Sequence, residues 1–444
     1  MKSIIVVFIL TLLSSSVLGG QEWIGTWGTC MAETGHTLLE FDPLGSGAVF
    51  PPQILDGRTI RMIVHSSIGG GNIRLRLSNA YPTPVLPSTS KAQQFVNIGE
   101  VRVALQDVGA SIVPSSDQRV KFGGNTSIII PPNAVVLSDP IDFDLPDRVN
   151  LAVSIYITSV ITGHIYAARH PLAHQTSYIS TNLGDFASDV SGTQFGNTTT
   201  EWFYISAVEV LKRGHTVVAL GDSITEGQGT VVDSNTRYTD YLAGRFLDTH
   251  MRVGVVNSGI SGNQLNYDCP SALFAGVDCI LPVGPNALAR FDRDVLVVPG
   301  VKQVIVLLGT NDISISSQGL NPYPSPLDPN FVSSLTAQIV LGYRQLVERG
   351  HENGLEVYGC TIPPAQGPGS PNNTPNFELT RQAVNMKIRN GDIFDAFFDF
   401  DLILRNSTVP SQLNSTFDSG DHIHPNFRGY KAMVEEGIDL SLFS

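Results

Sequence analysis

A serine at the end of an apolar run is the residue of this sequence best placed for nucleophilic chemistry. Ser223 follows the apolar residues 217–220 and the pair Gly221 and Asp222. Four consecutive apolar residues bounded by a glycine are typical of a strand buried on both faces. Open α/β sheets carry their chemistry at the carboxyl ends of such strands. The alternative is an ordinary turn or helix N-cap, which Gly-Asp-Ser also suits.

Three further blocks of polar residues are candidates for the same site as Ser223. Two of them, Asn-Ser-Gly-Ile-Ser-Gly-Asn at 257–263 and Gly-Thr-Asn-Asp at 309–312, follow apolar runs. The third, Asp-His-Ile-His-Pro at 421–425, lies near the C-terminus. Because the carboxyl ends of parallel strands meet at one edge of a sheet, we expect these blocks to lie beside Ser223.

The four blocks resemble those of the GDSL, or SGNH, hydrolase family, whose named residues are a Ser, a Gly, an Asn and a His. The residues that correspond to them are Ser223, Gly262, Asn311 and His424. Asp421 stands three residues before the last histidine, as it does in that family. Residues 23–27 and 290–294 have a lesser similarity to a secreted two-domain branch of that family. The resemblance implies a serine esterase with a flavodoxin-like strand order.

A serine hydroxyl attacks well only when a neighbouring base takes its proton. We expect His424 to be that base for Ser223. Asp421 would accept the other ring N–H of His424, which fixes the tautomer and stabilises the imidazolium. Considered alone, residues 421–424 also suit a helix N-terminal turn or a metal site that uses His422 and His424.

The oxyanion of a tetrahedral intermediate needs fixed hydrogen-bond donors. We predict the backbone N–H groups of Ser223 and Gly262 and the side-chain amide of Asn311. Glycine suits this role because a backbone N–H approaches a substrate closely when no side chain intrudes. The alternative is that Gly262 and Asn311 only form turns. We expect Asp222 and Asp312 to bind loop backbone and to take no catalytic step.

Length, composition and charge limit the classes of protein, partner and cofactor that this sequence allows. The chain has 444 residues, enough for two domains, and its 42% hydrophobic and 15% charged residues indicate a globular protein. A net charge of −13 argues against a nucleic-acid partner. No phosphate loop, dinucleotide fingerprint or zinc-ligand spacing occurs, so the sequence predicts no cofactor and no metal. His170 and His174 have a helical metal-like spacing, but Pro171 favours a loop.

The N-terminus and the sequons predict an exported protein. Residues 1–20 combine Lys2, an apolar core and small residues, as a secretory signal does; the alternative is a buried first strand. No second apolar segment is long enough for a membrane span, so we expect a soluble extracellular protein. Sequons that predict glycosylation occur at Asn125, Asn197, Asn372, Asn406 and Asn414.

Four cysteines allow three pairings in an oxidising compartment. Cys269 and Cys279 bracket a short loop and are predicted to form a local disulfide. Two alternatives remain for the other pair. Cys30 and Cys360 form a disulfide across the two domains, or Cys360 is a buried free thiol.

Residues 21–212 predict an antiparallel β-sandwich of the jelly-roll kind, because short alternating runs are separated by Gly, Pro and Asn. The runs 59–66 and 73–77, separated by three glycines, predict a hairpin. We expect this domain to pack beside the active-site cleft, with its aromatic residues in the core. The alternative, a carbohydrate-stacking surface, would use Trp23, Trp27, Tyr81 or Trp202.

Residues 213–444 alternate apolar strand-like runs with helical stretches, which predicts a three-layer α/β/α sandwich around a five-stranded parallel sheet. The clearest helix spans 331–352, with Asp328 as its expected cap and Pro329 in its first turn. The proline-rich loops 314–330 and 363–376 follow strands and are predicted to wall the cleft.

The sequence thus predicts a secreted esterase that cleaves carboxylic esters, either small or linked to a polysaccharide, through an acyl-Ser223 intermediate. A carbohydrate O-deacetylase or a lipase on the same fold is the first alternative. The second is a carbohydrate-binding protein with a vestigial hydrolase domain. The intact set of site residues weighs against a vestigial site, which should have lost members.

Overall fold

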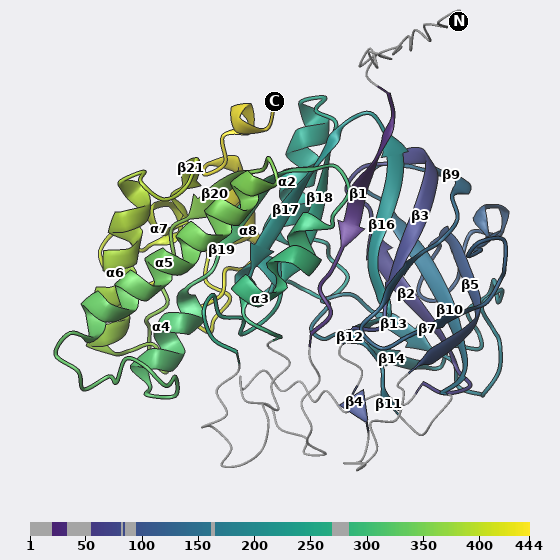
Figure 1. Ribbon diagram of the computed structural model, residues 1–444, viewed down its shortest axis with the longest axis horizontal. Coiled ribbons are helices and arrows are strands. Elements are labelled where there is room, and N and C mark those ends of the chain that lie inside the picture. Colours follow the sequence, from purple (N-terminus) through teal and green to yellow (C-terminus); the bar gives the residue numbers. More distant parts are fainter. Residues whose placement is uncertain (1–19, 33–54, 81–82, 85–94, 161–164, 269–283) are drawn as a thin grey trace, which may run out of the picture.

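The computed structural model describes residues 20–32, 55–80, 83–84, 95–160, 165–268 and 284–444. An antiparallel β-sandwich forms the first part of the chain, and a parallel sheet covered by helices on both faces forms the second (Figure 1). The predicted fold class is confirmed. Apart from Gly20, the predicted signal segment lies outside the described residues, as do Cys269 and Cys279. None of the described helices is long and apolar enough to cross a membrane.

The sandwich consists of two main sheets. One has the order β1-β16-β3-β8, with β9 also paired to β3, and its strands are β1 (Glu22–Gly28), β3 (Gly70–Ser78), β8 (Val135–Leu137), β9 (Ile141–Leu145) and β16 (Ile205–Lys212). The other has the order β14-β13-β2-β10-β5-β6, with β7 also paired to β5. Its strands are β2 (Thr59–His65), β5 (Val96–Leu105), β6 (Gln118–Arg119), β7 (Ile128–Ile130), β10 (Asn150–Val160), β13 (Ser177–Ile179) and β14 (Asn197–Thr199). Two short pairs are β4 (Thr83–Pro84) with β11 (Ile165–Tyr166) and β12 (Arg169–His170) with β15 (Trp202–Phe203).

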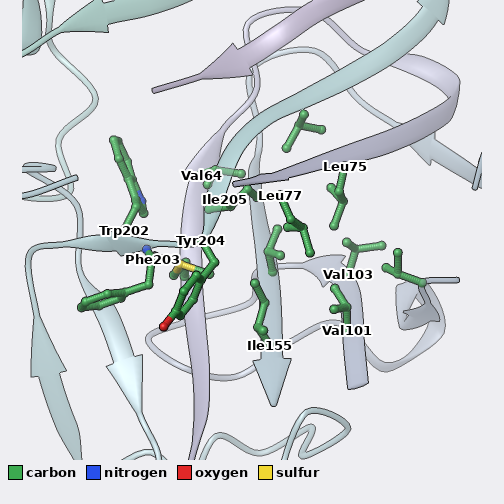
Figure 2. Packing of buried hydrophobic residues seen from close by; sticks show 14 of the residues in the cluster. Val64, Leu75, Leu77, Val101, Val103, Ile155, Trp202, Phe203, Tyr204 and Ile205 are labelled. Atoms are coloured by element: carbon green, nitrogen blue, oxygen red, sulfur yellow. Dashed lines mark hydrogen bonds between the residues drawn. The ribbon is translucent and has the colours of Figure 1, made fainter. Parts of the chain in front are cut away.

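The inner faces of these sheets enclose one hydrophobic core (Figure 2). Leu75 and Leu77 of β3 are fully buried, whereas Arg76 between them is partly exposed, as expected for a strand with one solvated face. Trp27 and Trp202 are 8% and 6% exposed and meet edge to face, with ring centroids 4.9 Å apart. Their predicted place in the core is confirmed, whereas Tyr81 lies outside the described residues.

The predicted hairpin between residues 59–66 and 73–77 is wrong. β2 lies in one sheet between β13 and β10, so both of its edges are filled, and β3 lies in the other sheet. The glycines between them carry the chain from one sheet to the other. At this corner a Cβ on Gly69 would lie 2.0 Å from the carbonyl oxygen of Leu145, which explains the need for glycine without a hairpin.

The parallel sheet has the order β18-β17-β19-β20-β21, the flavodoxin-like order that the resemblance implied. Its strands are β17 (His215–Gly221), β18 (Val253–Gly259), β19 (Val301–Leu307), β20 (Glu356–Cys360) and β21 (Ala396–Phe398). One face packs against α3 (Ala287–Phe291), η3 (Asp292–Leu296), α4 (Thr310–Ser317), α5 (Phe331–Glu352) and α6 (Pro375–Arg389). The other face packs against α2 (Tyr238–Asp248), α7 (Phe400–Leu404), α8 (Phe427–Glu435) and η4 (Leu440–Phe443). The strand order reverses between β17 and β19, where open α/β sheets place their ligands.

The long helix α5 has the predicted bounds but a different N-terminus. Its N-cap residue is Asn330 rather than Asp328, and Pro329 precedes the helix. Asp328 Oδ1 instead accepts a hydrogen bond from the backbone N–H of Asn330, at 2.8 Å. The expected cap therefore forms the turn before the helix.

Strand β1 joins the two parts of the molecule by lying against β18 (Figure 1). The Gly25 N–H donates to Thr216 Oγ1 at 2.9 Å, and the Val255 N–H donates to Ser67 Oγ at 2.9 Å. The two backbones approach so closely that a Cβ on Gly254 would lie 2.0 Å from the carbonyl oxygen of Gly25. These hydrogen bonds link residues on either side of the domain boundary that was predicted near residues 212–213. The bounds of the two domains stay a prediction.

The structure decides between the two alternatives for Cys30 and Cys360 and disagrees with one predicted glycosylation site. Both cysteines are buried free thiols, as in the second alternative, and no disulfide joins them. Cys30 packs with Ile260, whereas Cys360, the last residue of β20, lies in the core on the other side of the sheet. Asn372 is 2% exposed, which leaves no room for a glycan in the folded chain. The sequons at Asn125 and Asn197 are exposed, and those at Asn406 and Asn414 are half-buried.

Candidate active site

Ser223 lies where β17 turns directly into the short helix α1 (Ser223–Glu226). Asp222 caps this helix by accepting a hydrogen bond from the Ile224 N–H at 3.0 Å. Because Ser223 is the first helical residue, its own N–H has no acceptor within the helix. The turn is so tight that a Cβ on Gly221 would lie 1.9 Å from Thr225 Oγ1, which explains the glycine before the Asp-Ser pair.

The loop before α8 places an imidazole beside Ser223, 201 residues away in the chain. His424 Nε2 lies 2.8 Å from Ser223 Oγ, and His424 Nδ1 lies 2.6 Å from Asp421 Oδ2. Since the carboxylate can only accept, Nδ1 carries the proton and Nε2 is free to accept one from the serine. Burial raises the pKa of Asp421, but hydrogen bonds from the His424 ring and the His424 and Ile423 N–H groups outweigh it and hold the pKa well below its usual value.

The neighbouring His422 does not share a site with His424. Its Nδ1 lies 2.7 Å from Asp418 Oδ2, and its ring packs against Gly367, where a Cβ would lie 2.4 Å from the ring. Among the described residues, no group of His, Cys, Asp and Glu side chains could hold a metal ion. The ring of His422 therefore braces this loop against the chain that follows β20.

Gly262 and Asn311 lie in two loops that contact each other. Gly262 has a φ of +75°, in the left-handed region that favours glycine. Asn311, at the start of α4, donates from Nδ2 to the carbonyl oxygen of Asn263 at 3.0 Å and faces Asp222 Oδ2 at 3.4 Å. Contacts of Asn311 with Asn263 and Asp222, and of His424 with Ser223, thus bring the four sequence blocks to one place.

Two buried aspartates fix these loops, as the sequence predicted. Asp312 accepts hydrogen bonds from the N–H groups of Leu265 and Asn266 at 2.8 and 3.0 Å, and Asp222 caps α1. Burial raises the pKa of Asp222 to about 7 and that of Asp312 to about 6. Asp222 thus binds the backbone that follows Ser223, and Asp312 binds the backbone that follows the Gly262 turn.

Arg290 is a central residue of the site whose role the sequence did not reveal. Its side chain is 1% exposed and donates to the carbonyl oxygens of Gly221 and Ser258, both at 2.9 Å, and to Asn263 Oδ1 at 3.0 Å. It also lies 3.2 Å from Asp294 Oδ2. One guanidinium thus ties the ends of β17 and β18 to the loop that contains Gly262. The only available signal was the lesser similarity at residues 290–294.

The sandwich also reaches the site. His170 Nε2, on β12, lies 3.1 Å from Glu226 Oε1 on α1, and both residues are buried. Arg237 donates from Nη2 to the carbonyl oxygen of Ala173 at 2.6 Å and from Nε to that of Glu226 at 3.2 Å. His170, Glu226 and Arg237 line a cavity of about 40 Å³ between the two parts. No sequence motif marked any of these contacts.

His174 follows on the same loop as His170 but makes different contacts. Its φ is +49°, and its carbonyl oxygen accepts from the Asp233 N–H at 3.0 Å. Burial, with the nearby charge of Arg237, lowers the pKa of His174 to about 3, so the ring is neutral. The two histidines do not form the metal pair that their spacing resembles.

Comparison with known proteins identifies one family model and several similar solved structures. Residues 219–432 match the model of the GDSL-like Lipase/Acylhydrolase family, and no curated protein matches the chain. Similar solved structures include a GDSL-like lipase from Bacteroides thetaiotaomicron, at 20% identity over 49% of this chain and 83% of that one, with a TM-score of 0.33. Others are the esterase EstA from Pseudoalteromonas sp. (17% identity, 50% of this chain and 93% of that one, TM-score 0.33) and an acetyl xylan esterase from Geobacillus stearothermophilus (18%, 50% and 91%, TM-score 0.34). Residues 219–432 therefore form a GDSL-like lipase/acylhydrolase domain, the kind of domain found in ester-hydrolysing enzymes.

Proposed function

We propose that the protein is a secreted serine esterase that cleaves carboxylic esters through an acyl-Ser223 intermediate. The observation that carries this proposal is the continuous chain of contacts from Ser223 Oγ through the His424 ring to Asp421, at 2.8 and 2.6 Å. Hydrogen bonding at both ring nitrogens is the geometry that general-base activation of a serine requires.

In the proposed reaction, Ser223 Oγ attacks the ester carbonyl carbon while His424 Nε2 takes the hydroxyl proton. The tetrahedral intermediate collapses when His424 returns that proton to the departing alcohol oxygen, and this leaves the acyl group on Ser223. Water then attacks the acyl carbon as His424 takes its proton, and the acid leaves when Ser223 Oγ is reprotonated. Asp421 stays ionised throughout, because its pKa lies far below neutrality.

The oxyanion would bind to the N–H groups of Ser223 and Gly262 and to the Asn311 amide. In the structure, this amide has a good acceptor in the Asn263 carbonyl oxygen at 3.0 Å and a long contact with Asp222 at 3.4 Å. We expect the long contact to be the one that the amide exchanges for the oxyanion. In the transition state, the Asn311 amide then exchanges its long contact with Asp222 for a strong hydrogen bond to the oxyanion.

Substitution of the serine tests the proposal directly. Ser223→Ala should abolish hydrolysis of an aryl acetate while the melting temperature stays near that of the wild type, because His424 is the only hydrogen-bond partner of the hydroxyl among the described residues. Unchanged turnover in this variant would rule out the acyl-serine mechanism.

The substrate and the export of the chain belong to the same proposal. An O-deacetylase or a lipase on this fold would differ only in the pocket, so a series of esters from acetate to palmitate, with acetylated polysaccharides beside it, separates the three. Secretion predicts a mature chain that lacks residues 1–20 in the culture medium, with glycans at sequons other than the buried Asn372. Mass spectrometry of the secreted protein would show both.

A further inference from the structure

The sandwich contacts the proposed oxyanion loop through a buried chain of three side chains. Glu226 is the last residue of α1, which begins at Ser223, and it is 3% exposed. Its Oε2 accepts a short hydrogen bond from Ser261 Oγ. Its Oε1 lies 3.1 Å from Nε2 of His170 on β12 of the sandwich. These side-chain contacts therefore run from the sandwich to the residue just before Gly262.

Ser261 controls the direction of the Gly262 N–H. That N–H belongs to the peptide plane that joins Ser261 to Gly262, and the plane is rigid. Holding the Ser261 side chain thus holds the donor that would face the oxyanion. Arg290 and Asn311 hold the other side of this turn through Asn263, at 3.0 Å each. The Ser261 side of the turn is held by Glu226 and thereby by His170.

The environment of His170 fixes its orientation. Its Nδ1 lies 2.7 Å from the carbonyl oxygen of Cys30, which can only accept, so Nδ1 carries a proton. Its ring stacks on Trp202, with centroids 5.5 Å apart and planes inclined by 28°. The second nitrogen, Nε2, then faces Glu226 at ion-pair distance but without the alignment of a linear hydrogen bond.

We infer that His170 is a positioning residue for ester hydrolysis, which acts through Glu226 and Ser261 to orient the Gly262 N–H. The sandwich is then a working part of the active site. This inference rests on the proposed function for its kinetic consequences, whereas the ordering of the Gly262 turn is a structural consequence that can be measured separately.

The kinetic test uses His170→Phe, which keeps a ring over Trp202 and removes both nitrogens. We expect kcat for an aryl acetate to fall by about 10- to 100-fold with KM changed less than about threefold, since full loss of one oxyanion donor costs about 100- to 1,000-fold. Affinity for an alkyl boronic acid, which forms a tetrahedral adduct on the serine, should fall in parallel. His65→Phe is the matched control, because His65 lines the same cavity but bonds Asn150, at 2.7 Å.

A double-mutant cycle distinguishes an effect that passes along the His170–Glu226–Ser261 contacts from general destabilisation of the protein. Ser261→Ala should lower kcat by a similar factor, and the double variant with His170→Phe should be no slower than the slower single variant, because both remove the same link. Glu226→Gln should keep most activity, since its amide oxygen still accepts from Ser261, whereas Glu226→Leu should lose it. The inference would be overturned if the losses of kcat in Ser261→Ala and His170→Phe were additive in the double variant, or if His170→Phe kept the wild-type kcat.

Hydrogen exchange keeps the inference testable if the esterase proposal fails. Backbone amides in a peptide covering residues 258–266 should exchange faster in His170→Phe than in the wild type or in His65→Phe. Equal exchange rates would overturn the positioning role, whatever the activity. An active wild type with an inactive Ser223→Ala and an unaffected His170→Phe would leave the proposed function standing and remove only this inference.

Discussion

The α/β part and the sandwich contribute to the site in different ways. In the α/β part, functional residues directly follow buried strands, as Ser223 follows β17 and Asn311 follows β19. In the sandwich, His170 belongs to a two-residue strand and contacts the α/β part through a buried carboxylate. A parallel sheet collects its strand ends at one edge, so chemistry there is visible as motifs. A contribution from the sandwich has no such local pattern and depends on how the two parts pack.

The largest effect should come from a change confined to the α/β part. Asp421→Asn should lower kcat by about 10,000-fold, because the amide no longer holds the His424 tautomer that leaves Nε2 free. The melting temperature should change little, because Asp421 lies in a surface loop. Steady-state kinetics and thermal unfolding measure the two effects. A modest loss of kcat would mean that Asp421 does not orient the ring.

Arg290 should matter to both stability and catalysis, because it ties two strand ends to the Gly262 loop. Arg290→Met should cost about 3–5 kcal/mol of unfolding free energy, because three buried oxygens lose a charged donor at about 1–3 kcal/mol each. It should also lower kcat in the variant that remains folded. Asp294 keeps Arg293 as a partner at 2.6 Å, so the loss would reflect the bonds of Arg290 to backbone and Asn263.

Arg349→Met is the control for that experiment. Arg349 pairs with Asp292, which is 72% exposed, and such surface pairs contribute about 0–1 kcal/mol. Equal destabilisation by the two substitutions would show that the buried tie is no stronger than a surface pair.

The contact between the two parts is tested at Gly254. A Cβ there would lie 2.0 Å from the carbonyl oxygen of Gly25, a backbone atom that cannot rotate away. Gly254→Ala should therefore destabilise the protein by about 2–3 kcal/mol, measured by urea unfolding. Gly71→Ala, where a Cβ meets nothing within 4 Å, should be close to neutral. Wild-type stability of Gly254→Ala would show that β1 can move off β18 without cost.

The smallest effect concerns the pH dependence of stability. The pKa of Asp222 rises from its ordinary value of 3.8 to about 7 on folding, so the folded chain binds this proton more tightly. Wild-type stability should then fall as pH rises from about 4 to 7, whereas Asp222→Asn lacks this loss. The variant should gain on the order of 2 kcal/mol relative to the wild type between pH 5 and pH 8.5, since each pKa unit corresponds to about 1.4 kcal/mol. Parallel stability curves for the two proteins would contradict the raised pKa.

Most predictions that failed concerned which segments meet. Alternation located β2 and β3 correctly, but the glycines between them form a corner between sheets, and a corner and a hairpin need the same residues. The sequence could not decide between a Cys30–Cys360 disulfide and a buried free thiol, and the structure shows free thiols because the two cysteines lie in separate cores. The sequon at Asn372 marked a residue whose burial, at 2% exposure, depends on the folded loop around it.

The sequence by itself determined the strand–helix alternation, the long helix α5 and the residues that gather at the sheet edge, because hydrophobic period and strand-end chemistry are local properties. Only the tertiary structure decided that one guanidinium, that of Arg290, ties two strand ends to the glycine turn. It also decided that His170 faces Glu226 across the junction. A buried charge finds its partners through packing between distant segments, and no spacing along the chain records that choice.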